Sequence, residues 1–143
     1  MRILLSAGEP SGAQRARELA EELLKLEPSL EIVSAGVPAG KQVLGLPSPV
    51  IGFQEALREL GSLKGRLKAL SRLSATCDAA VLVDYPGFHL CLARSSNAKN
   101  LVYYIPPQVW AWGTWRVRAL ARRFKLVLST LPFEARLLKS WGV

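Results

Sequence analysis

The sequence contains very few of the side chains that bind metals or form disulfide bonds. It has two cysteines, Cys77 and Cys91, and a single histidine, His89, which form neither a CxxC motif nor a zinc-binding spacing. A disulfide or a metal site is therefore the minor interpretation, and we expect no cofactor. We predict that both cysteines are free and buried, as is usual in a reducing compartment.

Long apolar runs are also missing, although half of the 143 residues are apolar. No run approaches the roughly 18 uninterrupted apolar residues of a membrane-spanning helix. The first apolar run resembles the start of a signal peptide, but Glu9 and Pro10 interrupt it. We therefore interpret Arg2 to Ser6 as the first strand of a cytoplasmic protein, whose length fits a single domain over residues 1–143.

Acidic residues are scarce in the second part of the chain. Residues 61–143 contain thirteen Lys and Arg and three Asp and Glu, whereas residues 1–60 contain six and eight, which divides the net charge of +8 into +10 and −2. Such asymmetry indicates an anionic partner: phosphate, nucleic acid or a membrane surface. The basic clusters from Arg58 to Arg72 and from Arg116 to Lys125 are either solvated helix faces or, beside apolar stripes, surfaces that lie on anionic lipid.

What the sequence does contain is a regular alternation of strand and helix patterns. Ser11 and Gln14 form a predicted capping box for the first helix, which Pro28 ends, and Gly61 is predicted to interrupt a later one. The fold class that we expect is α/β, with a Rossmann-like, mostly parallel sheet of about five or six strands. Further strands are expected over 31–35, 43–46, 79–83, 101–105 and 126–129. Helices are expected over a stretch that contains Ala56, Leu57 and Leu60, over 63–73, 88–98 and 115–123, and from 132 to about 141.

Three acidic residues adjoin the expected strands. Ligands of open α/β sheets bind outside the carboxyl ends of the strands, which is where Glu9 and Asp84 are expected. Asp84 is either a half-desolvated general base or a solvated acid that caps the helix from Phe88, and its position alone leaves both open. Asp78 precedes its strand, so we expect it at the opposite end of the sheet in a structural role.

The turn from Gly8 to Gly12 can hold a phosphate at a helix N-terminus. It is neither a GxGxxG motif nor a P-loop, so an ordinary turn between strand and helix is at least as good an interpretation. His89 lies near the same sheet edge as Asp84 and is a candidate substrate contact. A lone histidine is more often structural, and we favour that role.

Three tryptophans, Trp110, Trp112 and Trp115, lie in a Pro-rich loop after the strand that contains Tyr103 and Tyr104. The two tyrosines point to opposite faces of a strand, so one of them is expected in the core. Three tryptophans exceed what packing needs and favour the binding of sugars, bases or acyl chains, although one or two of them are expected in the core. A nucleic-acid binder is the more distant alternative, because the apolar stripe beside the basic residues indicates lipid, and we expect no nucleic acid as partner.

Five motifs resemble, in the same order, those of the lipid-A-disaccharide synthase family. They are Gly8-Glu9-x-Ser11-Gly12, Val50-Ile51-Gly52-Phe53-x-Glu55, Asp84-x-Pro86-x-Phe88, Val109-Trp110-Ala111-Trp112 and Leu131-Pro132-Phe133-Glu134. Each motif is weak alone, whereas five in order are a strong signal. The resemblance covers essentially the whole chain, but only the N-terminal half of the family.

The resemblance implies one half of a two-Rossmann-domain (GT-B type) glycosyltransferase that uses no metal. Such an enzyme transfers diacylated glucosamine from a UDP donor to a monosaccharide 1-phosphate lipid, with inversion at the sugar. The N-terminal domain faces the phosphorylated glycolipid acceptor and the membrane, and the absent C-terminal domain binds the UDP-sugar. We therefore expect a chain that is inactive alone and peripheral on the inner face of the cytoplasmic membrane, with a homodimer left open. The alternative is a non-catalytic α/β module that binds phosphorylated glycolipid or anionic membrane.

The same resemblance implies a set of site residues. Asp84 falls on the family's essential acid, as a base for the acceptor hydroxyl. The substrate-binding set is Glu9, Ser11, Gly12, His89, Gln108, Trp110 and Trp112, and the membrane-contact set is Val50, Ile51, Phe53, Leu57, Arg58, Leu60, Lys64 and Arg66. The chain departs from the family's pattern at Ala13, Gly87, Pro106 and Gly113, and it has His89 where the family has Asn.

Overall fold

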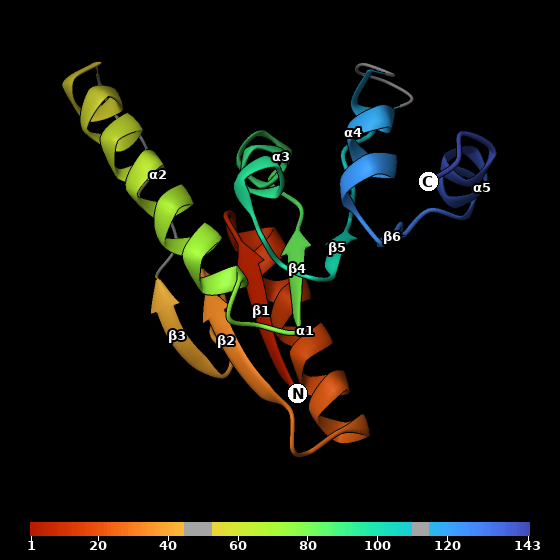
Figure 1. Cartoon of the computed structure of the whole chain (residues 1–143), viewed down its shortest axis with the longest axis horizontal. Coiled ribbons are helices and arrows are strands. Elements are labelled where there is room, and N and C mark those ends of the chain that lie inside the picture. Colours follow the sequence, from red (N-terminus) through yellow and green to blue (C-terminus); the bar gives the residue numbers. More distant parts are fainter. Residues whose placement is uncertain (45–52, 110–114) are drawn as a thin grey trace.

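The computed structural model describes residues 1–44, 53–109 and 115–143, with the side chains of 42–62, 110–115 and 119 outside this description. Strands and helices alternate along the chain (Figure 1). The strands are β1 (Arg2–Ala7), β2 (Glu31–Ala35), β3 (Lys41–Leu44), β4 (Ala79–Val83), β5 (Leu101–Tyr104) and β6 (Leu126–Leu128). The helices are α1 (Pro10–Leu26), α2 (Phe53–Ser74), α3 (Pro86–Ser95), α4 (Trp115–Arg123) and α5 (Pro132–Ser140).

The six strands form one sheet in the order β3-β2-β1-β4-β5-β6, and each neighbouring pair is parallel. The predicted α/β Rossmann-like fold is therefore confirmed. From β1 the chain builds outward to β3 and then returns to place β4 on the other side of β1. The order of strands thus reverses at β1 and β4, and the region outside the carboxyl ends of such a pair is the position at which these sheets bind ligands.

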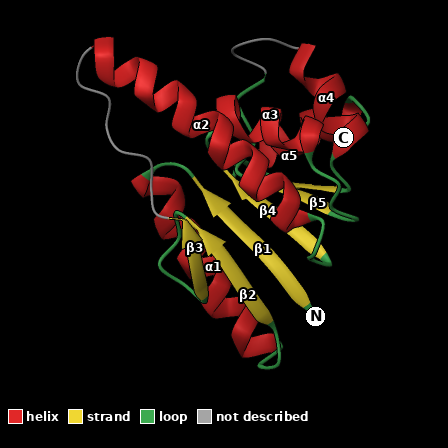
Figure 2. Ribbon diagram, turned by 60° about the vertical axis from the view of Figure 1, so that its left-hand side comes forward, coloured by secondary structure: helices red, strands yellow, loops and turns green. Residues whose placement is uncertain are grey.

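Helices cover both faces of the sheet (Figure 2). On one face α1 contributes the small residues Ala13, Ala16 and Ala20 to a core cluster that includes Leu5 of β1 and Val83 of β4. Because these helix residues are small, the α1 backbone lies close to the strands. A second cluster fills the other face, and each of the remaining helices contributes a leucine to it: Leu70, Leu92, Leu120 and Leu138. Within the described residues, no helix has the length and apolarity needed to cross a membrane.

Strand positions agree closely with the sequence pattern, but several helix boundaries do not. The capping-box prediction is wrong, because α1 begins at Pro10 after Glu9, with Ser11 already inside its first turn and no side-chain cap. The prediction of an interruption at Gly61 is also wrong, because α2 is one continuous helix. A glycine inside a helix costs only about 1 kcal/mol relative to alanine, and that penalty does not end a long helix.

Smaller corrections concern the middle of the chain. The short strand expected over 43–46 lies at Lys41–Leu44, and the helix expected from Phe88 begins two residues earlier, at Pro86. Cys77 is buried as predicted, whereas Cys91 is exposed, so the prediction of two buried thiols is wrong for Cys91. Cys91 lies on the outward side of α3, where Gly87, Arg94 and Ser95 are also exposed.

Candidate functional site

Two glycines allow the segments that follow β1 and β4 to pack closely against each other. A Cβ atom built on Gly8 would lie 1.9 Å from the ring of Tyr85, so that ring lies directly against the Gly8 backbone. A Cβ on Gly12 would lie 3.4 Å from the Cβ of Asp84 and from the carbonyl oxygen of Val83. The two glycines thus bring the turn after β1 and the start of α1 against the end of β4.

The backbone at the end of β4 is strained. Asp84 and Tyr85 have φ angles of 53° and 50°, in the left-handed region that residues with side chains rarely adopt. Ile105, directly after the neighbouring strand β5, has a φ of 60°, which is rarer still for a β-branched residue. Strain of this kind costs about 1–3 kcal/mol per residue and concentrates at functional sites, so the surrounding contacts must hold it in place.

A buried hydrogen-bond network supports this strained turn. The main-chain carbonyl of Asp84 lies 2.6 Å from Nδ1 of His89 and accepts from the Tyr103 hydroxyl at 2.9 Å. The Nε2 of His89 lies 3.1 Å from the hydroxyl of Ser6 on β1. The imidazole and Ser6 are buried, as is Tyr103. The network therefore connects β1, β4, α3 and β5 through the carbonyl of Asp84.

The partners fix the tautomer of His89. A carbonyl oxygen only accepts, so Nδ1 carries the proton and donates it to Asp84, while Nε2 accepts from the Ser6 hydroxyl. Burial lowers the pKa of His89 to about 4, against an ordinary value of 6.5, although its bond to the Asp84 carbonyl opposes the shift. Burial likewise raises the pKa of the Tyr103 phenol, with the charge of Asp84 acting in the same direction. Both side chains are thus neutral at physiological pH.

The Asp84 carboxylate itself is half-buried, and it has no hydrogen bond or ion pair with any side chain that the structure describes. It is not a helix cap, because the residue that precedes α3 is Tyr85 and that position has no side-chain cap bond. The alternative in which Asp84 caps the helix is therefore wrong. The main-chain N–H of Asp84 donates to the carbonyl oxygen of Tyr104 at 2.9 Å, so the hydrogen bonding between β4 and β5 extends as far as Asp84.

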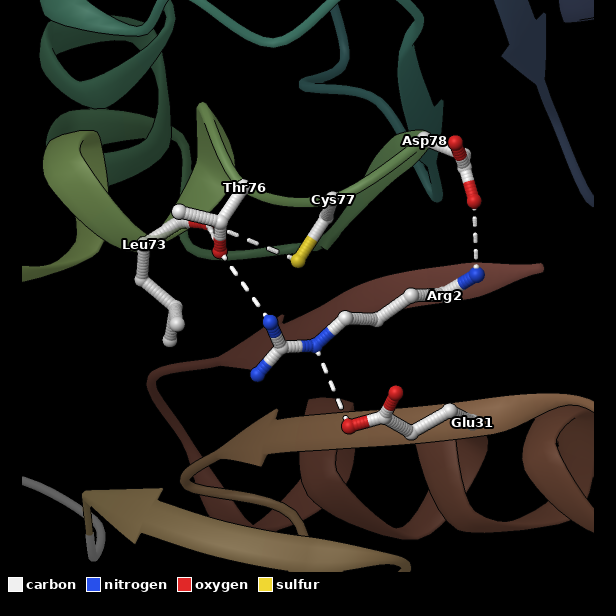
Figure 3. Close-up of polar contacts among 6 residues, drawn as sticks. All are labelled: Arg2, Glu31, Leu73, Thr76, Cys77 and Asp78. Atoms are coloured by element: carbon white, nitrogen blue, oxygen red, sulfur yellow. Dashed lines mark hydrogen bonds and ion pairs between the residues drawn. The ribbon is translucent and has the colours of Figure 1, made fainter.

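Asp78 lies at the other end of β4 and is structural, as predicted. Its carboxylate accepts from the main-chain N–H of Arg2 at 2.7 Å (Figure 3). The guanidinium of Arg2 in turn forms an ion pair with Glu31 at 3.2 Å and donates to Thr76 at 3.4 Å. These contacts hold the amino ends of β1, β2 and β4 together.

The predicted substrate-binding residues fall into three groups. Glu9 and Ser11 are exposed at the first turn of α1, with Gly12 buried behind them, and Gln108 is exposed beyond β5. Trp110 and Trp112 lie outside the described residues. His89 is fully buried with both ring nitrogens in use, which agrees with the structural role that the sequence favoured.

Most of the predicted membrane-contact set is not described. Val50 and Ile51 lie outside the described residues, and the side chains of Phe53, Leu57, Arg58 and Leu60 on α2 do too. Lys64 is exposed on α2 and Arg66 is half-buried. Membrane contact therefore stays a prediction for this set.

Sequence reasoning missed the roles of Ser6 and Tyr103. Ser6 was treated as part of an apolar strand, although a polar residue inside such a strand signals a buried hydrogen bond. For Tyr103, the sequence correctly predicted that one of two neighbouring tyrosines is in the core. The hydroxyl's partner, a carbonyl 19 residues earlier, has no sequence signature.

Local packing explains one departure from the family's pattern, Ala13, and does not explain another, Gly87. Ala13 is buried at the inner face of α1, where a small side chain fits. Gly87 is exposed, and a Cβ built there would meet nothing within 4 Å. A side chain at Gly87 would therefore fit without rearrangement, so packing does not require glycine there.

Comparisons with known proteins agree with this geometry. The sequence profile of the family described as lipid-A-disaccharide synthetase matches residues 3–143. Lipid-A-disaccharide synthases of Geobacter metallireducens and Geobacter sulfurreducens are 34% and 35% identical over 152 aligned residues, and each alignment covers 99% of this chain. One from Sulfurihydrogenibium sp. is 32% identical, with 98% of this chain covered. The chain spans 37–40% of the length of these relatives. It belongs to the lipid-A-disaccharide synthetase family.

Proposed function

We propose that this chain is the acceptor-side half of a glycosyltransferase that joins a diacylated glucosamine to a phosphorylated monosaccharide lipid. The observation that carries the proposal is the placement of Asp84. Its carboxylate lies outside the carboxyl end of β4, at the reversal of strand order, on a turn held by three buried side chains. Family membership supplies the reaction class, and the lipid-A-disaccharide synthases that resemble this chain support it by name.

In this proposal Asp84 acts as a general base. Its carboxylate takes the proton from an acceptor hydroxyl while that oxygen forms a bond to the anomeric carbon of the donor sugar. The bond from that carbon to the UDP oxygen breaks, and its electron pair leaves with UDP. Attack opposite the leaving group inverts the sugar carbon. A carboxylate with no described partner is free to accept that proton.

In this proposal a second domain holds the donor, because the turn after the first strand is neither a GxGxxG motif nor a P-loop. We therefore expect this chain alone to release no UDP from a UDP-sugar. The direct test fuses it to the remaining C-terminal portion of the Geobacter sulfurreducens relative and measures UDP release with donor and phosphorylated lipid acceptor. The fusion is expected to release UDP only when the acceptor is present. A folded fusion that binds UDP yet never transfers would contradict the proposal.

A non-catalytic lipid-binding module is the second candidate, and the basic residues of α2 favour it. Lys64, Lys68 and Arg72 lie exposed along one helix. Either candidate places the protein on the inner face of the cytoplasmic membrane, in contact with anionic lipid. Sedimentation with vesicles tests that placement: binding to anionic vesicles and none to neutral ones is expected, whereas equal binding to both would overturn it. Lipid binding together with an inactive fusion would favour the non-catalytic candidate.

A further inference from the structure

A groove runs between α2 and α3, on the outer side of these helices. Two adjoining cavities of about 490 and 330 Å³ form it, and they share Lys64, Leu67 and Cys91. The helices are held together at their C-terminal ends, where Ser71 donates to the carbonyl of Ser95 and the hydroxyls of Ser74 and Ser96 lie 2.7 Å apart. Volumes of this order are typical of small-molecule sites, ~300–1,000 Å³. We call the surface bounded by Lys64, Leu67, Lys68, Arg72, Phe88 and Cys91 the α2–α3 groove.

The two ends of the groove differ in character. Toward the carboxyl end of β4 the lining is mostly apolar, with Leu63, Leu67, Phe88 and Cys91 beside Tyr85. The rings of Tyr85 and Phe88 stack there, with centroids 5.7 Å apart. This end therefore leads to the turn that carries Asp84. An apolar channel of this kind suits a hydrocarbon chain.

Toward the C-terminal end of α2 the lining is cationic. Lys68 and Arg72 line this cavity together with Ser71 and Ser95, and Lys64 borders both cavities. The sequences of α3 and of α2 from Leu63 onward contain no acidic residue. The positive charges of the rim are thus not neutralised by α3 or by the described side chains of α2, and the groove is complementary to an anion attached to an apolar chain.

We propose that the α2–α3 groove binds one acyl chain of a lipid phosphate, with the chain between Leu67, Phe88 and Cys91 and the phosphate at Lys68 and Arg72. This inference deepens the proposed function, on which it rests only for the expectation of a lipid ligand. Its test needs no sugar donor and no transfer. If the lipid phosphate does not bind in the groove, the glycosyl-transfer proposal is unaffected. If the fusion is inactive, the proposal for the groove is unaffected.

Cys91 provides a direct readout, because it is exposed in the groove whereas Cys77 is only 4% exposed. The experiment follows the alkylation rate of both thiols with a water-soluble maleimide by mass spectrometry. Dodecyl phosphate, below its critical micelle concentration, is the probe. At about nine times its apparent Kd it should slow the alkylation of Cys91 about tenfold by occupancy alone. Inorganic phosphate and neutral dodecyl maltoside are expected to leave the rate unchanged.

A charge-reversed variant tests the cationic rim. Lys68→Glu/Arg72→Glu should raise the apparent Kd for dodecyl phosphate at least about tenfold, since two attractive pairs become repulsive. The matched control, Arg122→Glu/Lys139→Glu, changes the net charge by the same amount at exposed positions on α4 and α5. It should shift the apparent Kd for dodecyl phosphate by less than about twofold. Slow alkylation of Cys77 in each variant shows that it is folded.

Several results would overturn the proposal. One is no protection of Cys91 by dodecyl phosphate. Equal protection by inorganic phosphate would indicate a free-phosphate site, and equal protection by dodecyl maltoside would indicate an apolar groove without anion selectivity. Equal shifts in the two charge variants would mean attraction to net charge alone. Protection by anionic vesicles but never by the monomeric probe would indicate contact with a bilayer surface in place of a single-chain site.

Discussion

His89 acts as donor and acceptor at the same time, and few side chains can replace it. Its Nδ1 donates to the Asp84 carbonyl and its Nε2 accepts from Ser6. An asparagine amide also has one donor end and one acceptor end, and asparagine is the residue that the family's pattern has at this position. The substitution to His thus preserves the type of hydrogen bonding, and it adds an aromatic ring that packs edge-on against Tyr103.

Removing this hydrogen bonding should destabilise the fold. In His89→Leu the buried Ser6 hydroxyl loses its acceptor. The Asp84 carbonyl loses one of its two described side-chain donors and keeps the Tyr103 hydroxyl. We expect the free energy of unfolding in urea to fall by about 1–3 kcal/mol more for His89→Leu than for His89→Asn. Equal losses in the two variants would show that packing volume matters here and hydrogen bonding does not.

The buried neutral imidazole also predicts a pH dependence. The pKa of His89 is about 4 in the folded protein and ordinarily 6.5. Below pH 6.5 the unfolded chain binds a proton that the folded chain does not, so stability falls as pH falls from 6.5 toward 4. Between pH 7.5 and 5 this loss should be about 2 kcal/mol in urea unfolding.

His89→Asn is the control for this titration, because His89 is the single histidine of the chain. The variant keeps all carboxylates and loses the imidazole. Its stability should therefore change much less between pH 7.5 and 5. A wild-type protein whose stability changes no more than that of the variant would contradict a buried, neutral His89.

At the scale of elements, the sequence predicted the sheet better than it predicted the site. Strands such as β2 and β4 are apolar runs bounded by turn residues, so periodicity and length locate them. Helix starts depend on cap geometry, and Ser11 lies inside the first turn of α1 although its sequence pattern predicts a cap. Contacts between elements distant in sequence, such as those of Ser6 and Tyr103 with the turn at Asp84, leave no local pattern. The acid was therefore predictable, but not the network that supports it.

Arg123 makes a contact between α4 and α3 that the sequence does not predict. The sequence placed it in a basic cluster that was expected to face solvent or lipid. In the structure its guanidinium donates to the carbonyls of Ala93, Arg94 and Ser96, with distances of 2.8 Å from Nε to Ala93, 3.1 Å to Arg94 and 3.2 Å to Ser96. It thus satisfies the last carbonyl groups of α3 from the end of α4.

Replacing Arg123 should therefore cost more than replacing its neighbour. We expect Arg123→Ala to lower the free energy of unfolding by about 1–2 kcal/mol, since hydrogen bonds from a charged donor are lost. Arg122→Ala, an exposed position on the same helix turn, should change it by less than about 0.5 kcal/mol. Chemical denaturation of both variants decides the matter, and similar values for the two would contradict the role of Arg123.

The two glycines of the first turn should also respond differently to alanine. Gly8→Ala places a Cβ 1.9 Å from the Tyr85 ring, so the ring or the turn must move. We expect a loss of about 1–3 kcal/mol of unfolding free energy, as for other overpacked sites. Gly12→Ala meets its nearest neighbours at 3.4 Å and gains helix propensity of up to about 1 kcal/mol, so its net effect should be small. Thermal or urea unfolding that ranks the two variants in the opposite order would show that Tyr85 does not lie against Gly8.

At the scale of the whole molecule, our proposal makes the chain one wall of a two-part site. The turns after β1 and β4 bring together the Asp84 carboxylate, a glycine turn and a buried hydrogen-bond network, and the α2–α3 groove reaches this region at Tyr85. The chain spans about 40% of the length of the Geobacter relatives. In the proposed reaction a second wall, which is not among the residues described, binds the donor.

The central claim is that Asp84 is the base of the transfer reaction. The most direct measurement compares UDP release by the fusion to the Geobacter sulfurreducens C-terminal portion in three forms: unaltered, Asp84→Asn and Asp78→Asn. Asp78 is the matched control, because it is an acid on the same strand at the opposite end of the sheet. General-base catalysis contributes about 10²–10⁴-fold, so Asp84→Asn should lower kcat by that factor with little change in KM, while folded Asp78→Asn retains activity. Turnover that survives Asp84→Asn unchanged would contradict the assignment.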